Sequence, residues 1–162
     1  MLNKEQKLKY YKNKELAEGI LKGELARNNQ IVYGARASNI HLPSYLQKHT
    51  EDYDVLTKKP ESSARELINK LNKEYGGEYF RLEQAKHKGT YKVISNVTNK
   101  TVADFTRAYR HPETKEHLGI NYATPKSIKR ALIKSLKNPD AEFRRDKDLD
   151  TLQRIKLGIN TW

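Results

Sequence analysis

The chain has 162 residues, of which 36% are hydrophobic and 32% charged, a composition that excludes a fully disordered protein. With 32 Lys and Arg against 20 Asp and Glu, the formal net charge of +12 favours an anionic partner, either nucleic acid or a phosphate-rich ligand. The absence of cysteine excludes disulfides, Cys-ligated metal sites and thiol nucleophiles.

The first part of the chain predicts a helix, a short strand and a second, shorter helix. Residues 3–27 carry apolar side chains at approximately helical spacing among charges, which predicts an amphipathic helix weakened near Gly19 and Gly23. The segment QIVYG then predicts a buried strand that ends at Gly34. The following segment, ARASNIHL, predicts one or two helical turns, which Pro43 ends.

The middle of the chain predicts a second strand, a helix and three further strands. The segment TEDYDVLT alternates with period 2 and is rich in strand formers. A helix is expected from Pro60 to the glycine pair at Gly76. The segments EYFRLEQA, TYKVISNV and KTVADFTRA are separated by turns, so we expect them to form an antiparallel meander.

The last third of the chain predicts helices alone. Thr124 and Pro125 are typical of the start of a helix, which we expect to reach about Leu136. The segment NPD then interrupts the pattern, and a final helix is expected over residues 147–157. We therefore expect one α+β domain over 1–162: an N-terminal helix in 1–29, a sheet core with an acidic site in 30–110, and C-terminal helices in 111–162.

The sharpest chemical signal is the pair Asp52 and Asp54 in the predicted second strand. Residues two apart in a strand share a face and lie about 6.5–7 Å apart along the chain, so both carboxylates point the same way. Two such carboxylates repel each other, and a divalent cation removes the conflict. Oxygen ligands of this kind favour Mg²⁺ or Mn²⁺. The same pair by itself is also typical of a solvated strand edge.

Two further features favour a metal-dependent phosphate site. Gly34 leads from a strand into a short helix, where backbone N–H groups can face a phosphate, and Arg36 adds a cation suited to a triphosphate. Asp104 is a lone acid in an otherwise apolar strand, where its burial is costly. If this strand neighbours the strand of Asp52 and Asp54, the three carboxylates can hold two metal ions about 3.5–4 Å apart.

The order of these motifs along the chain resembles the nucleotidyltransferase superfamily, whose fold is shared with DNA polymerase β and tRNA nucleotidyltransferases. The family motif is a glycine pair, an acid-x-acid pair on the next strand, and a third acid on a later strand. The stretch GARASNIHLPSYLQKHTEDYDV looks like small nucleotidyltransferase-like proteins of bacteriophages and large DNA viruses, and more loosely like AbiEii-type toxins. The segment RRDKDLDTL is similar to the family's R-x-x-K-D-L segment, so the resemblance covers residues 30–155.

The resemblance implies a nucleotidyltransferase-like fold, with a short mixed β-sheet and flanking helices, and a catalytic site of three acids. Asp52 and Asp54 would bind both metal ions. Asp104 would bind the catalytic metal ion and help to polarise the acceptor hydroxyl. These roles come from the family and not from the spacing of the acids.

The resemblance also implies a triphosphate site around the turn at Gly34. With the cations expected from their charge and position, the residues that would line it are Gly34, Ala35, Arg36, Ser38 and Lys147. Lys147 could reach a phosphate while Asp148 pairs with a neighbouring arginine, but the same segment is equally typical of an ordinary salt-bridged helix start. Ala35 departs from the family pattern, because a second Gly or Ser is usual there. The backbone donors are kept at this position, but a hydroxyl contact is lost.

A basic stripe is expected on the helix that begins near Thr124. Its five cations recur at helical spacing without an intervening acid: Lys126, Lys129, Arg130, Lys134 and Lys137. We expect this stripe to lie opposite the apolar residues Ile128, Leu132, Ile133 and Leu136. Such a stripe suits the phosphate backbone of nucleic acid, but it is also typical of the solvated face of an amphipathic helix.

Together these patterns predict a metal-dependent enzyme that transfers an NMP from an NTP to a hydroxyl, with pyrophosphate leaving. The basic surface favours the 3′ end of RNA or DNA as acceptor over a protein hydroxyl. The alternative is a catalytically degenerate viral or phage protein of the same fold, acting as a nucleic-acid-binding or virion-associated module. Because no signal-peptide core or membrane-spanning run is present, we expect no membrane partner and a location in the cytoplasm, or in the host cytoplasm or virion if the protein is viral.

Overall fold

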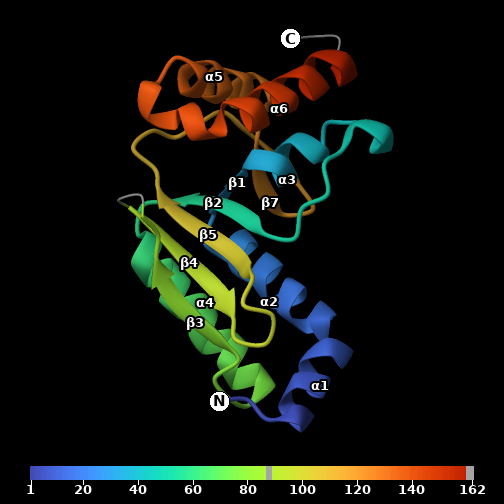
Figure 1. The fold of residues 1–162 in the computed structure, drawn as a ribbon, viewed down its shortest axis with the longest axis vertical. Coiled ribbons are helices and arrows are strands. Elements are labelled where there is room, and N and C mark those ends of the chain that lie inside the picture. The colour runs from blue at the N-terminus through green and yellow to red at the C-terminus, as the bar shows by residue number, and fades with distance from the viewer. Residues whose placement is uncertain (87–88, 160–162) are drawn as a thin grey trace.

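One seven-stranded mixed sheet runs through the protein, with strand order β3-β4-β5-β2-β1-β7-β6 (Figure 1). The structure is a computed structural model that describes residues 1–86 and 89–159. At the centre of the sheet, β2 (Tyr53–Thr57) pairs antiparallel with β1 (Ile31–Tyr33) and parallel with β5 (Thr101–Arg107). The strands that carry the acidic motifs are therefore direct neighbours.

The antiparallel meander predicted in the middle of the chain is present on one side of this centre. It consists of β3 (Phe80–Gln84), β4 (Thr90–Ser95) and β5. Its inner face is apolar, because Val93 and Phe105 alternate with residues that point to the other face.

On the other side of the centre lies a strand pair that the sequence pattern does not predict. β7 (Ile120–Ala123) pairs parallel with β1, and β6 (Thr114–His117) pairs antiparallel with β7 at the sheet edge. The prediction of helices alone after residue 111 is therefore wrong for this segment. The strand β6, TKEH, lies at an exposed edge and carries no apolar residue, so it lacks the alternation by which strands are recognised.

Two helices cover one face of the sheet. α4 (Pro60–Tyr75) packs against β2, β3, β4 and β5, and α2 (Lys14–Arg27) packs against α4 and β7. The predicted boundaries of α4 are confirmed, since Pro60 occupies its first turn and Gly76 caps its end with a φ of +78°. Its buried stripe contains Ala64, Leu67 and Leu71.

The single helix predicted over residues 3–27 is two helices. α1 (Lys4–Lys12) ends at Asn13, and α2 begins directly after it. The break falls at Asn13 and not at Gly19 or Gly23. The Asn13 carbonyl accepts from the Leu16 amide in the first turn of α2 and, at 2.5 Å, from the Tyr75 hydroxyl. No helix among the described residues is long and apolar enough to cross a bilayer.

The opposite face of the sheet carries the remaining helices, which gather at one end of the molecule (Figure 1). Thr124 caps the predicted helix at Pro125, accepting from the Ser127 amide, and α6 begins at Arg145, two residues before its predicted start. α3 packs on β1 and β2, α5 packs on α3, and α6 packs on α5 and η1. These elements are α3 (Gly34–Asn39), η1 (Ser44–Leu46), α5 (Pro125–Leu136), η2 (Pro139–Arg144) and α6 (Arg145–Gly158).

Candidate active site

Three aspartates meet on the sheet face that carries α3. Asp54 and Asp104 are register partners on the parallel strands β2 and β5, so their side chains leave the same face next to each other. Asp52 lies just before β2 rather than within it, and the Thr50 hydroxyl donates to its carboxylate at 3.2 Å. One carboxylate oxygen from each of Asp52, Asp54 and Asp104 lies within 4.8 Å of the other two.

The cluster is electrostatically frustrated without a cation. Burial, followed by the charges of Asp52 and Asp104, raises the pKa of Asp54 to about 7. Burial also raises the pKa of Asp104, an effect that the positive charge of Lys92 opposes. The Oδ1 atom of Asp104 is buried and has no hydrogen-bond partner among the described residues. A divalent ion bound by oxygen ligands would relieve both the repulsion and the unpaired oxygen, so these residues fit Mg²⁺ or Mn²⁺.

Gly34 brings the backbone unusually close to this cluster. Its φ is +68°, and a Cβ atom at this position would lie 2.4 Å from Asp54 Oδ2. The turn from β1 into α3 therefore requires glycine for its backbone conformation and for the space that the carboxylate occupies. A sequence motif that was expected to approach a phosphate also approaches the Asp54 carboxylate.

The cluster lies in a cleft of about 920 Å³ between the sheet and the C-terminal helices. Ala35 and Ser38 of α3 line this cleft beside Gly34, as does Lys147 of α6. The positive charges of Lys147 and Arg144 oppose the raised pKa of Asp54. One wall therefore carries carboxylates and the facing wall carries cations, an arrangement suited to a metal ion with a polyanionic ligand.

Arg144 is a cleft residue that the sequence patterns did not single out. It pairs at 3.6 Å with Asp148, which is 2% exposed and accepts a hydrogen bond of 2.7 Å from the Ser135 hydroxyl. An ion pair of Asp148 with a neighbouring arginine is indicated by the sequence RRDKDL, but that sequence leaves open which arginine takes part. The burial of Asp148 shows that the pair is part of the α5–α6 contact.

Tyr33 also borders the cleft without having been expected there. It is the register partner of Asp54, and its hydroxyl donates to Thr106 Oγ1 at 3.3 Å. Burial and the charge of Asp54 raise its pKa to about 12, so the hydroxyl stays protonated near neutral pH. The only feature of the sequence that could have indicated Tyr33 as a cleft residue is its position directly before Gly34.

Arg36 does not line this cleft, in contrast to the expected triphosphate contact. Its guanidinium lies 4.0 Å from the centre of the Tyr53 ring, and its Nε donates to the Asp52 carbonyl at 3.2 Å. A looser ion pair of 3.9 Å joins it to Glu18 of α2. Because the first turn of α3 turns this side chain toward α2, Arg36 supports the backbone of Asp52 from outside the cleft.

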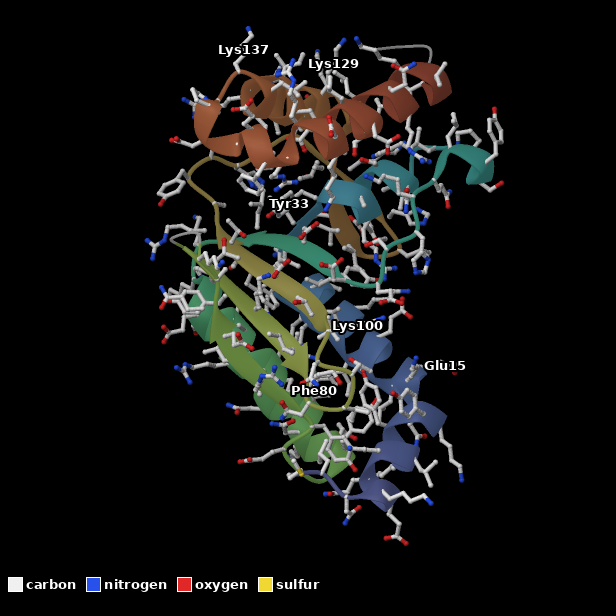
Figure 2. The ribbon with its side chains drawn as sticks, in the orientation of Figure 1. Glu15, Tyr33, Phe80, Lys100, Lys129 and Lys137 are labelled. Carbon is white, nitrogen blue, oxygen red and sulfur yellow. The ribbon has the colours of Figure 1, made fainter. Side chains whose placement is uncertain are left out.

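The basic stripe of α5 also lies away from the carboxylates. The residues of α5 that line the cleft are Ser127, Ile128, Ala131, Leu132 and Ser135, and none of the five cations is among them. Figure 2 shows Lys129 and Lys137 on the outer side of the helix. Ile133 is 37% exposed and lies on the outward side with the cations, so its expected place opposite the stripe is wrong.

Comparison with known proteins identifies the fold. The chain is similar to the Megavirus polyadenylate synthase, with a TM-score of 0.76 and 22% identity over 90% of this chain and 31% of that protein. Two Helicobacter pylori proteins, JHP933 and a candidate nucleotidyltransferase, match over 94% and 92% of this chain and 66% and 67% of their own. Their identities are 17% and 18%, and their TM-scores are 0.48 and 0.47.

The likeness to the Megavirus protein confirms the predicted nucleotidyltransferase-like fold. The predicted resemblance to proteins of large DNA viruses is also supported, because this structural neighbour is a viral protein. This chain spans only 31% of the length of that protein. No protein-family model and no curated protein matches the sequence.

Proposed function

We propose that this protein, whose fold is nucleotidyltransferase-like, is a metal-dependent enzyme that transfers an NMP from an NTP to a hydroxyl group. The observation that carries the proposal is the convergence of Asp52, Asp54 and Asp104, including a buried Asp104 oxygen without a partner, opposite a cationic wall. A cluster of this kind without a ligand costs stability, which is the usual mark of a functional site.

In this proposal Asp52, Asp54 and Asp104 hold Mg²⁺ or Mn²⁺. The bound ions supply charge neutralisation for the triphosphate and acidify the acceptor hydroxyl. Gly34, Ala35 and Ser38 form the floor under the triphosphate. Arg144 and Lys147 bind its oxygens from the opposite wall, as charged donors that need no rearrangement during the reaction.

The transfer itself needs no covalent enzyme intermediate. The acceptor oxygen attacks the α-phosphorus of the NTP and forms the new phosphodiester bond, while the bond from that phosphorus to the bridging oxygen breaks. Pyrophosphate leaves with the bonding electron pair, and the hydroxyl proton passes to solvent. The residues of the cleft act by positioning and by electrostatic stabilisation.

ATP and the 3′ end of RNA are the first substrates to test. The chain's net charge of +12 suits a nucleic-acid acceptor. Its structural neighbour from Megavirus is a polyadenylate synthase, which supports an adenylate donor and an RNA acceptor. Other NTPs and a DNA oligonucleotide belong in the same experiment.

The proposal is tested by incubating the protein with each α-labelled NTP, Mg²⁺ or Mn²⁺, and an RNA or DNA oligonucleotide. We expect the oligonucleotide to gain label, and the double variant Asp52→Asn/Asp54→Asn to lose at least ~10³-fold of the rate, because positioning and charge neutralisation both fail. Asp146→Asn, which removes one exposed carboxylate on α6, serves as the control. Transfer that persists in the double variant would contradict the assignment of the site to Asp52 and Asp54. If no label is transferred and the thermal stability of the protein does not change on adding Mg²⁺ and NTP, the proposed enzymatic activity is contradicted.

A further inference from the structure

The acceptor must reach the carboxylates from a side of the cleft that the structure leaves open. α3, α5 and α6 close the side of Asp54 that faces Arg144 and Lys147. The basic stripe of α5 lies on the outer side of that helix and does not lead to the carboxylates. One approach that no helix covers runs along the sheet, from Asp104 toward the meander.

A registered row of side chains crosses the sheet at this level. Tyr33 of β1 is the register partner of Asp54 on β2. Asp54 is in turn the register partner of Asp104 on β5, and Asp104 is the register partner of Lys92 on β4. Register partners leave the same face of a sheet, and neighbouring strands lie about 4.8 Å apart. Lys92 is therefore the cation that the sheet itself places next to Asp104.

The sheet face around Lys92 is open. The alternate residues Val93 and Phe105 point to the other face, where α4 packs against β3, β4 and β5. Within the described part of the chain, no helix lies over the near face of these strands in Figure 1. A chain-like ligand can therefore lie across β5 and β4 without displacing any element.

Lys92 lies between two acids on this face, its register partners Asp104 on β5 and Glu83 on β3. Glu83 is paired with Arg81 at 3.2 Å. Among the described residues the half-buried Lys92 ammonium makes no hydrogen bond or ion pair, although its charge acts on Asp104.

Beside Lys92, the hydroxyls of Thr90 and Thr106 are hydrogen-bonded to each other at 3.0 Å, and Thr106 Oγ1 also accepts from the Tyr33 hydroxyl. One O–H donor of this pair is left for a ligand. An ammonium group without a hydrogen-bond partner, next to a hydroxyl donor, can bind the oxygens of a phosphodiester group.

We propose that the 3′ end of a single-stranded nucleic acid lies across β5 and β4, with its last phosphodiester bound by Lys92 and its terminal hydroxyl beside Asp104. This inference rests on the proposed function and names the surface on which the acceptor binds. The triphosphate and the acceptor then occupy opposite sides of the carboxylates. The α5 stripe is not part of the path to the reacting hydroxyl.

The first test measures binding of a fluorescent oligonucleotide by anisotropy, with Mg²⁺ and without NTP, for Lys92→Gln. We expect the Kd to rise about 5- to 10-fold and the slope of log affinity against log salt to decrease by about 0.7, as for one phosphate contact on a single strand. Lys73→Gln, an exposed lysine of α4 beyond the other face of the same strands, should change neither value. In the active protein, the KM for the oligonucleotide should rise while the KM for NTP stays constant.

A second test uses an oligonucleotide that ends in a photoreactive 4-thiouridine, with the crosslinked peptide identified by mass spectrometry. Crosslinks in β4 or β5 are expected, and crosslinks in α5 would overturn the inference. A Lys92→Gln variant with altered Mn²⁺ affinity but unchanged oligonucleotide Kd would also overturn it, since Lys92 would then only neutralise Asp104. Oligonucleotide bound at β4 and β5 without any transfer of nucleotide would contradict the proposed function alone.

Discussion

The position that constrains the site most tightly is Gly34. Its backbone has a φ of +68°, and its missing side chain leaves the space that Asp54 Oδ2 occupies. Any other residue must strain the backbone and displace the carboxylate together. The conformation of the turn and the geometry of the three-aspartate cluster are therefore linked at one residue.

We expect Gly34→Ala to lower the free energy of unfolding by about 1–3 kcal/mol and to abolish specific Mn²⁺ binding. The loss of stability follows from the positive φ, and the loss of binding follows from the contact of 2.4 Å with Asp54. Urea unfolding measures the first effect, and Mn²⁺ titration followed by electron paramagnetic resonance measures the second.

Gly119→Ala is the matched control for this change. Its φ is +84°, but a Cβ atom there would meet only Ala26 Cβ at 3.9 Å. The control should therefore lose stability and keep its Mn²⁺ affinity. Equal Mn²⁺ binding by the Gly34 and Gly119 variants would contradict the role given to the close approach.

At the level of elements, the cationic wall of the cleft depends on how α6 packs on α5. Asp148 of α6 is almost fully buried, accepts from Ser135 of α5 and pairs with Arg144 at the end of η2. These contacts join the three C-terminal elements at one carboxylate. They also hold the Arg144 guanidinium on the cleft side of the helices.

We expect Asp148→Ala to lower the free energy of unfolding by about 1–3 kcal/mol, because it leaves the Ser135 hydroxyl without its acceptor and Arg144 without its counter-charge. If the enzyme is active, the same change should raise the KM for NTP, because Arg144 is no longer held against the cleft. Urea unfolding and steady-state kinetics measure the two effects. Asp146→Ala, an exposed change in the same turn, should stay within about 0.5 kcal/mol of the unchanged protein, and an equal loss in both variants would refute this role of Asp148.

At the level of the whole molecule, the acidic cluster links stability, pH and metal binding. The pKa of Asp54 is about 7 in the folded protein, against 3.8 for an ordinary aspartate. Between these values the folded state binds a proton that the unfolded chain releases, so the stability of the metal-free protein falls as the pH rises from about 4 to about 7. The metal-free cluster therefore lowers the stability of the folded protein near neutral pH.

The affinity for Mn²⁺ should therefore fall about 10-fold for each pH unit below 7 and should change little above 7, because Asp54 must lose its proton to bind the ion. Isothermal titration calorimetry at pH 6 and pH 8, each in two buffers of different ionisation enthalpy, measures both the affinity and the protons released. Equal affinity at the two pH values would contradict the raised pKa. As a control without metal, Asp54→Asn should be more stable than the unchanged protein at pH 8, with a smaller difference at pH 5.

Local chemistry in the sequence was sufficient for most elements of the core. Period-2 alternation indicated β2, turns between three strand-like segments indicated the meander, and Pro60 with Gly76 marked the ends of α4. The failures have physical causes. β6 lies at an exposed edge and carries no apolar residue, and the break at Asn13 coincides with a hydrogen bond from Tyr75, far along the chain.

The sequence by itself determined which residue types were available for a phosphate and metal site: Gly34 at a strand end, two acids in one short segment, and a lone acid in an apolar strand. It also determined the +12 charge that favours an anionic partner. Only the tertiary structure decided which of these charges share a surface. Asp104 meets Asp54 because β5 pairs with β2, whereas Arg36 points toward α2 and the α5 cations face outward. The periodicity of a segment defines the faces of one helix or strand. Which of these faces pack together depends on how both sides of the sheet are buried, and this burial involves residues that are distant in the chain.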